Sequence, residues 1–202
     1  MQSKKNNMIL PVIASGSPVL RKIGVDIDKD YPNLAELIEN MEETMVNAQG
    51  VGLAAPQVGL PIRLFLVDTS PFGGDDELAE DEREFLTNFK KVFINAKILK
   101  EEGEEWAFNE GCLSIPDIRE DVFRKEKITI EYFDENFNKH TDVIDGIAAR
   151  VVQHEYDHIE GILFTDKISS LKKRLIKKKL ENISKGKISV DYRMKFPLLK
   201  KR

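Results

Sequence analysis

The chain has very little cysteine, histidine or tryptophan, and no long apolar run. Its 202 residues include one cysteine, three histidines and one tryptophan. A single cysteine, Cys112, excludes an internal disulfide and favours the reducing cytoplasm as the compartment. No segment reaches the length of a transmembrane helix, and the N-terminus lacks the apolar core of a signal peptide. The net charge of −4 gives no global indication of binding to DNA or to a membrane.

The composition favours one folded domain. Apolar residues make up 41% of the chain, which supports a real core at this length. Residues 1–7 are polar and precede Met8, and we expect a disordered extension or a cloning remnant there. Residues 8–186 are predicted to form the single domain, and residues 187–202 a basic C-terminal tail. Strands followed by helices, without strict alternation, are typical of an α+β fold.

Local signals place the expected helices and strands. A helix is predicted from Asn33, with Glu36 as its capping-box partner, to about residue 49. Strands are predicted at residues 62–67, 92–99, 127–133 and 140–144. A hairpin turn is predicted at residues 101–105, around Gly103.

Two surface segments carry charge of mainly one sign. Residues 70–88 form an acidic segment, in which residues 75–84 are predicted as a loop or short helix. Residues 168–183 have apolar residues at helical spacing, which predicts an amphipathic C-terminal helix. The basic face of this helix carries Lys172, Lys173, Arg174, Lys177, Lys178 and Lys179.

The stretch His154-Glu155-Tyr156-Asp157-His158 carries the strongest chemical signal in the chain. It lies in a predicted helix between Asp145, which can cap the start, and Gly161, which can end it. Two histidines four residues apart lie on one helical face, so both imidazoles can bind one metal ion. Glu155 projects about 100° around the helix from His154, where a general base acts on water beside a metal. Two ordinary surface histidines are the alternative interpretation.

The same helical stripe continues as an apolar surface. Ile147 and Val151 precede His154 by seven and three residues, so the metal-facing side is apolar away from the ion. Apolar residues also occupy a neighbouring side of the helix. We therefore expect a helix that is buried in the core rather than one that lies on the surface.

A catalytic site of this kind needs a third protein ligand. His140 is available, but it lies in a turn-to-strand segment, and Glu160 is too close on the same helix. Cys112 is the only soft ligand, and the glycine before it, Gly111, permits close approach. From the residues alone, a lone cysteine is equally well explained as a small buried apolar side chain.

Three segments resemble, in their order, the signature motifs of the peptide deformylases. They are Gly50–Gln57 (GVGLAAPQ), Glu110–Ser114 (EGCLS) and Gln153–His158 (QHEYDH). The similarity runs roughly from Met8 to Ile183. It implies a bacterial-type enzyme with a helical C-terminus that removes the N-formyl group from the initiator methionine of new proteins. The expected fold is α+β, with mixed or antiparallel sheets wrapped around a central metal-binding helix, an N-terminal helix and a C-terminal amphipathic helix.

The resemblance also implies roles for individual residues. The metal ligands implied are Cys112, His154 and His158. Glu155 would be the general base, and Gln57 would help to hold the oxyanion. The backbone N–H of Leu113 is a further candidate donor to that oxygen.

Other residues are expected to contact the substrate. They are Val51, Gly52, Glu110, Gly111, Arg119, Ile147 and Val151. We predict that Val51, Ile147 and Val151 line an apolar slot for the methionine side chain. Glu110 is expected near the cysteine, with Arg119 or Arg124 as its ion-pair partner, and the sequence leaves that choice open.

The metal and the partners follow from the chemistry of the ligands and from the resemblance. Zn²⁺, Fe²⁺, Ni²⁺ and Co²⁺ all tolerate a mixed sulfur and nitrogen site, and the resemblance favours one Fe²⁺ per chain in the cell. The basic helix resembles the helical tail of bacterial members, which docks on the ribosome, although a solvated face is the alternative. We assume a monomer.

Two other functions are less compatible with the sequence. An H-E-x-x-H metalloprotease needs a third ligand downstream, and the residues after His158 contain neither histidine nor cysteine. A closed structural metal site needs a fourth cysteine or histidine at suitable spacing, and none is present.

Overall fold

The computed structural model describes residues 8–198. The predicted extension at residues 1–7 lies outside the described residues, as do residues 199–202 of the predicted tail. The strands are β1 (Val12–Ile13), β2 (Gly52–Ala54), β3 (Leu64–Asp68), β4 (Lys90–Cys112), β5 (Ile115–Phe133), β6 (Lys139–Asp145) and β7 (Met194–Lys195). The α-helices are α1 (Leu34–Asn47), α2 (Glu80–Asn88), α3 (Gly146–Ile159) and α4 (Ser170–Ser184). Short 3₁₀ turns are η1 (Pro18–Arg21), η2 (Ala55–Val58), η3 (Ser70–Gly74) and η4 (Phe164–Asp166). None of the helices within residues 8–198 combines the length and the apolarity needed to cross a bilayer.

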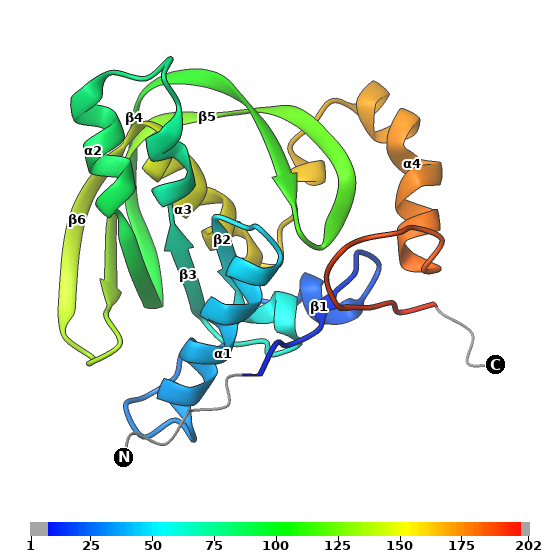
Figure 1. The fold of residues 1–202 in the computed structure, drawn as a ribbon, viewed down its shortest axis with the longest axis horizontal. Helices are drawn as coiled ribbons and strands as arrows, with labels where there is room; N and C mark the ends of the chain where they lie inside the picture. Colours follow the sequence, from blue (N-terminus) through cyan, green and yellow to red (C-terminus); the bar gives the residue numbers. More distant parts are fainter. Residues whose placement is uncertain (1–7, 199–202) are drawn as a thin grey trace.

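An antiparallel sheet and one helix form the centre of the molecule. The sheet has the order β2-β3-β4-β5-β6, and each neighbouring pair is antiparallel. The strands β4 and β5 arch over α3, which contacts β2, β3, β5 and β6 (Figure 1). A separate parallel pair joins β1 to β7. The expected α+β fold around a central helix, with an N-terminal and a C-terminal helix, is confirmed.

β4 and β5 form one long hairpin, and its turn was predicted in the wrong place. β4 runs through residues 101–105 without reversing, and Gly103, at φ +83°, lies where the register between the strands shifts. A glycine with positive φ suits a β-bulge as well as a turn. The chain reverses at Leu113-Ser114 instead, between the paired residues Cys112 and Ile115. This turn places the cysteine at the end of β4.

α3 is a core helix, as predicted. Most of its side chains are buried, and the apolar ones pack in one cluster with residues of β3, β4, β5 and β6. The helix begins after Asp145, which occupies the cap position but makes no side-chain capping hydrogen bond. It ends at Ile159, and Gly161 follows at φ +71°, a conformation that favours glycine after a helix.

α1 has the predicted apolar face but not the predicted cap. Leu34, Ile38 and Met41 are buried on that face. Asn33 precedes the helix at φ +54° and makes no capping hydrogen bond, so the capping box with Glu36 is wrong. A capping side chain usually reaches the first turn from an extended backbone, which Asn33 does not have.

The acidic segment at residues 70–88 is more ordered than a solvated loop. It forms η3 and α2, which pack on each other. Leu86 of α2 is buried in the core, and Phe72 of η3 packs against the same cluster. The segment therefore extends the core beside β3 and β4.

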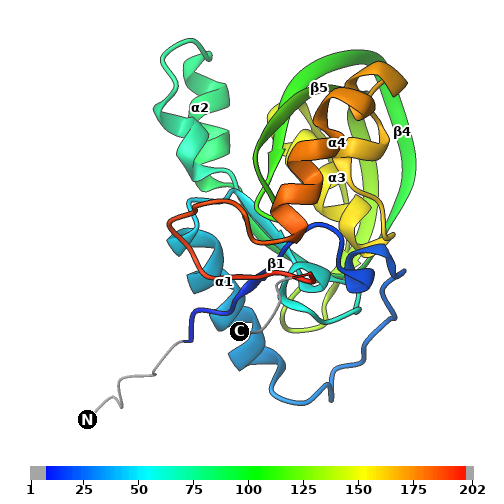
Figure 2. The ribbon, with the colours of Figure 1, turned by 90° about the vertical axis from the view of Figure 1, so that its right-hand side faces the viewer.

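The chain after α4 returns to the N-terminal part of the fold. α4 buries Ile176 and Ile183, whereas Leu171 and Leu175 are 59% and 71% exposed, so its apolar face is narrower than predicted. The segment beyond the helix crosses back to β1, beside which β7 lies (Figures 1 and 2). The described part of the predicted tail, residues 187–198, is thus integrated with the folded domain.

Candidate metal centre

Three side chains from two elements converge inside the fold. Cys112 ends β4, and His154 and His158 lie one turn apart on α3. One ligand atom from each lies within 4.8 Å of the other two, and the Cys112 Sγ is 3.3 Å from the His158 Nε2. Within residues 8–198 this is the group of histidine, cysteine and carboxylate side chains that meets the geometry of a metal site.

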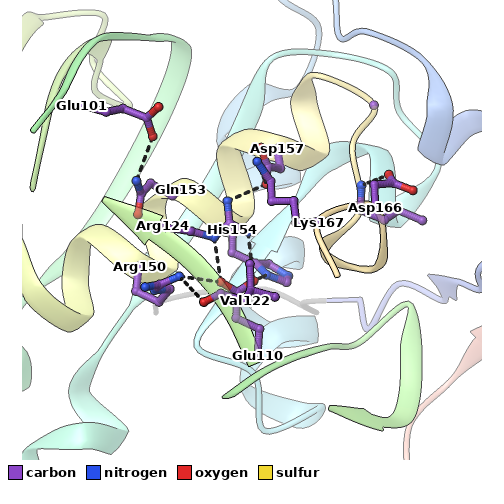
Figure 3. A network of polar contacts seen from close by, with 12 residues as sticks. Glu101, Glu110, Val122, Arg124, Arg150, Gln153, His154, Asp157, Asp166 and Lys167 are labelled. Atoms are coloured by element: carbon purple, nitrogen blue, oxygen red, sulfur yellow. Dashed lines mark hydrogen bonds and ion pairs between the residues drawn. The ribbon is translucent and has the colours of Figure 1, made fainter. Parts of the chain in front are cut away.

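Glu110 orients one of these histidines. Its Oε2 lies 2.9 Å from the His154 Nδ1 (Figure 3), which leaves the Nε2 of the same ring available to bind a metal ion. A carboxylate on the outer ring nitrogen fixes the ring and makes the inner nitrogen a better ligand. Glu110 therefore orients the ligand His154 rather than binding the metal ion itself, and it also lines the cavity.

Two arginines neutralise Glu110. Arg124 donates two hydrogen bonds to it, at 2.7 and 2.9 Å, and a third at 2.6 Å to Asp157 of α3. Arg150, 1% exposed, donates to Glu110 at 3.2 Å. Burial opposes the charge on Glu110, but the hydrogen bonds from Arg124 and His154 outweigh it and hold its pKa well below the usual range. The sequence left open whether Arg119 or Arg124 pairs with Glu110, and the structure shows that it is Arg124.

Replacing Arg124 with methionine is expected to destabilise the fold by about 3–5 kcal/mol. The substitution keeps the length of the side chain but leaves Glu110 and Asp157 as buried carboxylates with too little positive charge. Urea unfolding followed by circular dichroism measures the free energy of unfolding.

Arg83 provides the matched control, because its ion pair with Asp76 lies at the surface. The Arg83→Met variant should unfold close to the wild type. Equal stability of the two variants would contradict the assigned role of Arg124.

Glu155 lies beside the three-residue cluster but is not part of it. It is 4% exposed, and its Oε2 has no hydrogen-bond partner within the described residues. Burial raises the pKa of Glu155 to about 7. A Cβ placed on Gly52 would lie 2.4 Å from the Glu155 Oε1, so the first motif needs glycine there to make room for this carboxylate.

Gln57 is held with its amide nitrogen towards the cysteine. Its Oε1 accepts a hydrogen bond from the Ala54 N–H at 2.8 Å. Its Nε2 lies 3.5 Å from the Cys112 Sγ and 3.4 Å from the Ser114 Oγ. A fixed donor at this position can face an oxygen that gains negative charge during a reaction.

A cavity of about 800 Å³ opens beside these groups. The predicted substrate residues in its wall are Val51, Gly52, Glu110, Gly111, Arg119 and Val151. Gln57, Leu113, Glu155 and two of the expected metal ligands also line it. Ile147 does not: it lies in the first turn of α3 and packs in the core cluster. The stripe predicted from helical spacing therefore faces the cavity only at its C-terminal end.

Other lining residues were not predicted. They include Phe72, Phe108, Ile118, Arg150, Asp191 and Tyr192. Arg150 was visible as an arginine on a predicted core helix, a position that requires buried partners. No local pattern marks Phe72 or Tyr192, because long-range packing brings them to the cavity.

His140 and Arg119 have other partners. The His140 ring stacks on Tyr132, and its Nε2 lies 2.9 Å from an oxygen of Asp134. His140 is therefore not the third member of the cluster. Arg119 donates to the Asn109 side chain at 3.0 Å rather than to Glu110.

A cysteine sulfur and two imidazoles, beside a buried carboxylate with an unpartnered oxygen and open to a large cavity, are the arrangement of a metal-dependent hydrolase. Comparison with known proteins narrows the class. A family model described as polypeptide deformylase matches residues 9–174. The chain is 69% identical to a peptide deformylase of Christiangramia forsetii over 96% of this chain and 99% of that one.

Solved structures give the same result. A peptide deformylase from Legionella pneumophila superposes with a TM-score of 0.74 at 34% identity, covering 89% of this chain and 97% of the other. Peptide deformylase 1B from Arabidopsis thaliana, in complex with an inhibitor, gives a TM-score of 0.74 at 31% identity over 88% of this chain and 92% of the other. The chain belongs to the polypeptide deformylase family. It is a hydrolase that removes the N-formyl group from the N-terminal methionine of new proteins.

Proposed function

We propose that the chain performs this deformylation with one divalent metal ion held by Cys112, His154 and His158, and with Glu155 as the group that moves the proton. The observation that carries the proposal is the buried cluster of three ligand atoms beside an unpartnered carboxylate. Donors of these types are about 3.6 Å apart around a tetrahedral ion, and the Cys112 Sγ and His158 Nε2 are 3.3 Å apart. The residues present therefore fit a metal ion.

A metal ion held by these three residues would supply Lewis-acid chemistry, which would polarise the formyl carbonyl and make water a better nucleophile. Glu155 accepts a proton from the attacking water and delivers it to the amine that leaves. The Gln57 amide and the Leu113 backbone N–H donate to the oxygen that gains charge as the formyl carbon becomes tetrahedral. Glu155 and Gln57 are both buried, and a buried environment strengthens such interactions.

We propose Fe²⁺ as the ion in the cell, with Zn²⁺, Ni²⁺ or Co²⁺ able to replace it. A set of one sulfur and two nitrogen ligands accepts all four ions. A reducing compartment such as the cytoplasm keeps both Fe²⁺ and the sulfur of Cys112 in their reduced forms.

The apolar residues Val51 and Val151 support a slot for an unbranched side chain. We expect formyl-Met-Ala-Ser to exceed formyl-Asp-Ala-Ser in kcat/KM by about 100-fold or more, because an apolar wall leaves a carboxylate without partners. Formate release by the metal-loaded protein measures both rates. No formate from the methionine peptide would refute the proposed function. Equal kcat/KM values for the two peptides would show that Val51 and Val151 do not line the slot for the first side chain.

We further propose that α4 docks on the ribosome. Its Lys173, Arg174, Lys177, Lys178 and Lys179 are exposed, and such a row attracts a polyphosphate backbone. Reversing Lys177 and Lys178 to glutamate should abolish co-sedimentation with ribosomes and leave the peptide assay unaffected. Wild-type binding should also weaken steeply with salt.

A matched control reverses Lys22 and Lys29, which are exposed outside α4. This double variant should still co-sediment. Equal loss in both variants would indicate a general effect of charge, and wild-type binding that is insensitive to salt would favour a solvated helix face.

A further inference from the structure

The segment Ser189–Tyr192 lines the same cavity as the catalytic groups. It follows α4, in the part of the chain beyond the residues that the family model matches. The family motifs therefore assign it no role. Its place in the cavity wall means that a bound substrate can contact it.

Hydrogen bonds on two sides hold this segment in place. The Val12 N–H donates to the Arg193 carbonyl at 2.9 Å, and the Ala14 N–H donates to the Lys195 carbonyl at 2.9 Å. On the cavity side, the Tyr192 hydroxyl donates to the Leu113 carbonyl at 2.8 Å. The segment is therefore held at its C-terminal end, by Tyr192 itself and by the residues that follow it, and Figures 1 and 2 show this part of the chain returning from α4 to β1.

The wall stands beside the catalytic groups but is not part of them. Tyr192 contacts Leu113, which follows Cys112 in the hairpin turn. A cavity of about 800 Å³ lies in the upper part of the range for drug-sized ligands, so it has room for more than one amino-acid residue. Once the formyl group of a formylmethionyl peptide is at the metal centre, the rest of this cavity, which Ser189–Tyr192 lines, is available to the residues that follow.

The exposed charges around this wall are unbalanced. Asp117, Arg119 and Asp191 are the exposed ionisable residues that line the cavity. Arg119 is engaged by Asn109, and the deeper Glu110 and Arg150 are buried and bonded to each other. Two carboxylates and one guanidinium give the rim an excess of negative charge, which favours a cationic side chain nearby.

We propose that Ser189–Tyr192 is a substrate-binding wall that contacts the residue after the formylmethionine, and that Asp191 favours a basic side chain there. This inference rests on the proposed function, and it adds a specificity determinant outside the three motifs. Tyr192 is a positioning residue, because it ties the wall to the turn that follows the cysteine.

The test compares formyl-Met-Lys-Ser with formyl-Met-Glu-Ser as substrates. In the wild type, kcat/KM should favour the lysine peptide by about two- to fivefold, the size expected for one exposed charge pair. The ratio should fall towards one in Asp191→Asn and invert in Asp191→Lys. High salt should reduce the wild-type ratio.

Glu181→Lys is the matched control. It makes the same change of charge at an exposed residue of α4 that does not line the cavity, and it should retain the wild-type ratio. Formylmethioninamide, which has no second residue, is the reference substrate, and its rate should respond to the Asp191 variants less than the ratio does.

The outcomes are distinct. An unchanged ratio in Asp191→Lys, with all peptides still deformylated, would overturn the proposal. An equal shift in Glu181→Lys would also overturn it, because net charge alone would then explain the preference. Failure of the wild type to deformylate even formylmethioninamide would refute the proposed function itself.

Discussion

Replacing Glu155 with alanine is expected to lower kcat for formyl-Met-Ala-Ser by about 10²–10⁴-fold, the usual contribution of a positioned general acid–base group. The carboxylate is buried beside the metal centre, and its Oε2 has no other partner in the described residues. Because Glu155 is not part of the ligand cluster, the variant should keep its metal and its fold. Single-turnover formate release, metal analysis and circular dichroism measure the three properties.

Two further substitutions test the role of this carboxylate. Glu155→Gln keeps the shape but cannot accept the proton, and it should be about as slow as the alanine variant. Glu160→Gln changes a carboxylate just beyond α3 that pairs with Arg63, and it should remain active. Loss of metal in Glu155→Ala, with retention in His158→Ala, would show that the helix faces were assigned the wrong way round.

Removal of a metal ligand is expected to abolish activity by stripping the ion. In Cys112→Ala or His158→Ala only two protein ligands remain, whereas catalytic sites of this kind use three. Even partners of metal ligands cost about 10- to 100-fold in affinity when they are removed, so loss of a ligand itself should cost more. Metal content after gel filtration, measured by mass spectrometry, should fall from one ion per chain to near zero.

His140→Ala is the control for this series, since that histidine lies on β6 beside Asp134. It should retain a full complement of metal. If the Cys112→Ala variant kept one metal ion per chain and full activity, Cys112 would not be a metal ligand.

The sequence predicted the parts of the site that depend on local spacing. The two histidines and Glu155 lie on α3 as the helical period requires, and the helix ends at Ile159, two residues before the predicted glycine. Cys112 could not be placed beside them from spacing, because a long hairpin brings it there. Cys112 was predicted as the third metal ligand only because three segments of the chain resemble the motifs of the peptide deformylases.

The errors share a physical cause. Gly103 has a positive φ, which is compatible with both a bulge and a turn, and only pairing across the whole strand decides between them. Ile147 shares the helical stripe of Val151, but it packs in the core cluster, and only the middle of α3, residues 150–155, lines the cavity. The choice of Arg124 over Arg119 likewise depends on which side of β5 each side chain occupies.

The pairing of β1 with β7 has a consequence for how the enzyme is made. It joins Val12 to Met194, two residues that lie far apart along the chain. Contacts between such distant residues carry a large loop-closure entropy and tend to form late. The wall at Ser189–Tyr192 comes just before β7 in the chain, so we expect this side of the cavity to be among the last parts of the substrate site to form during folding.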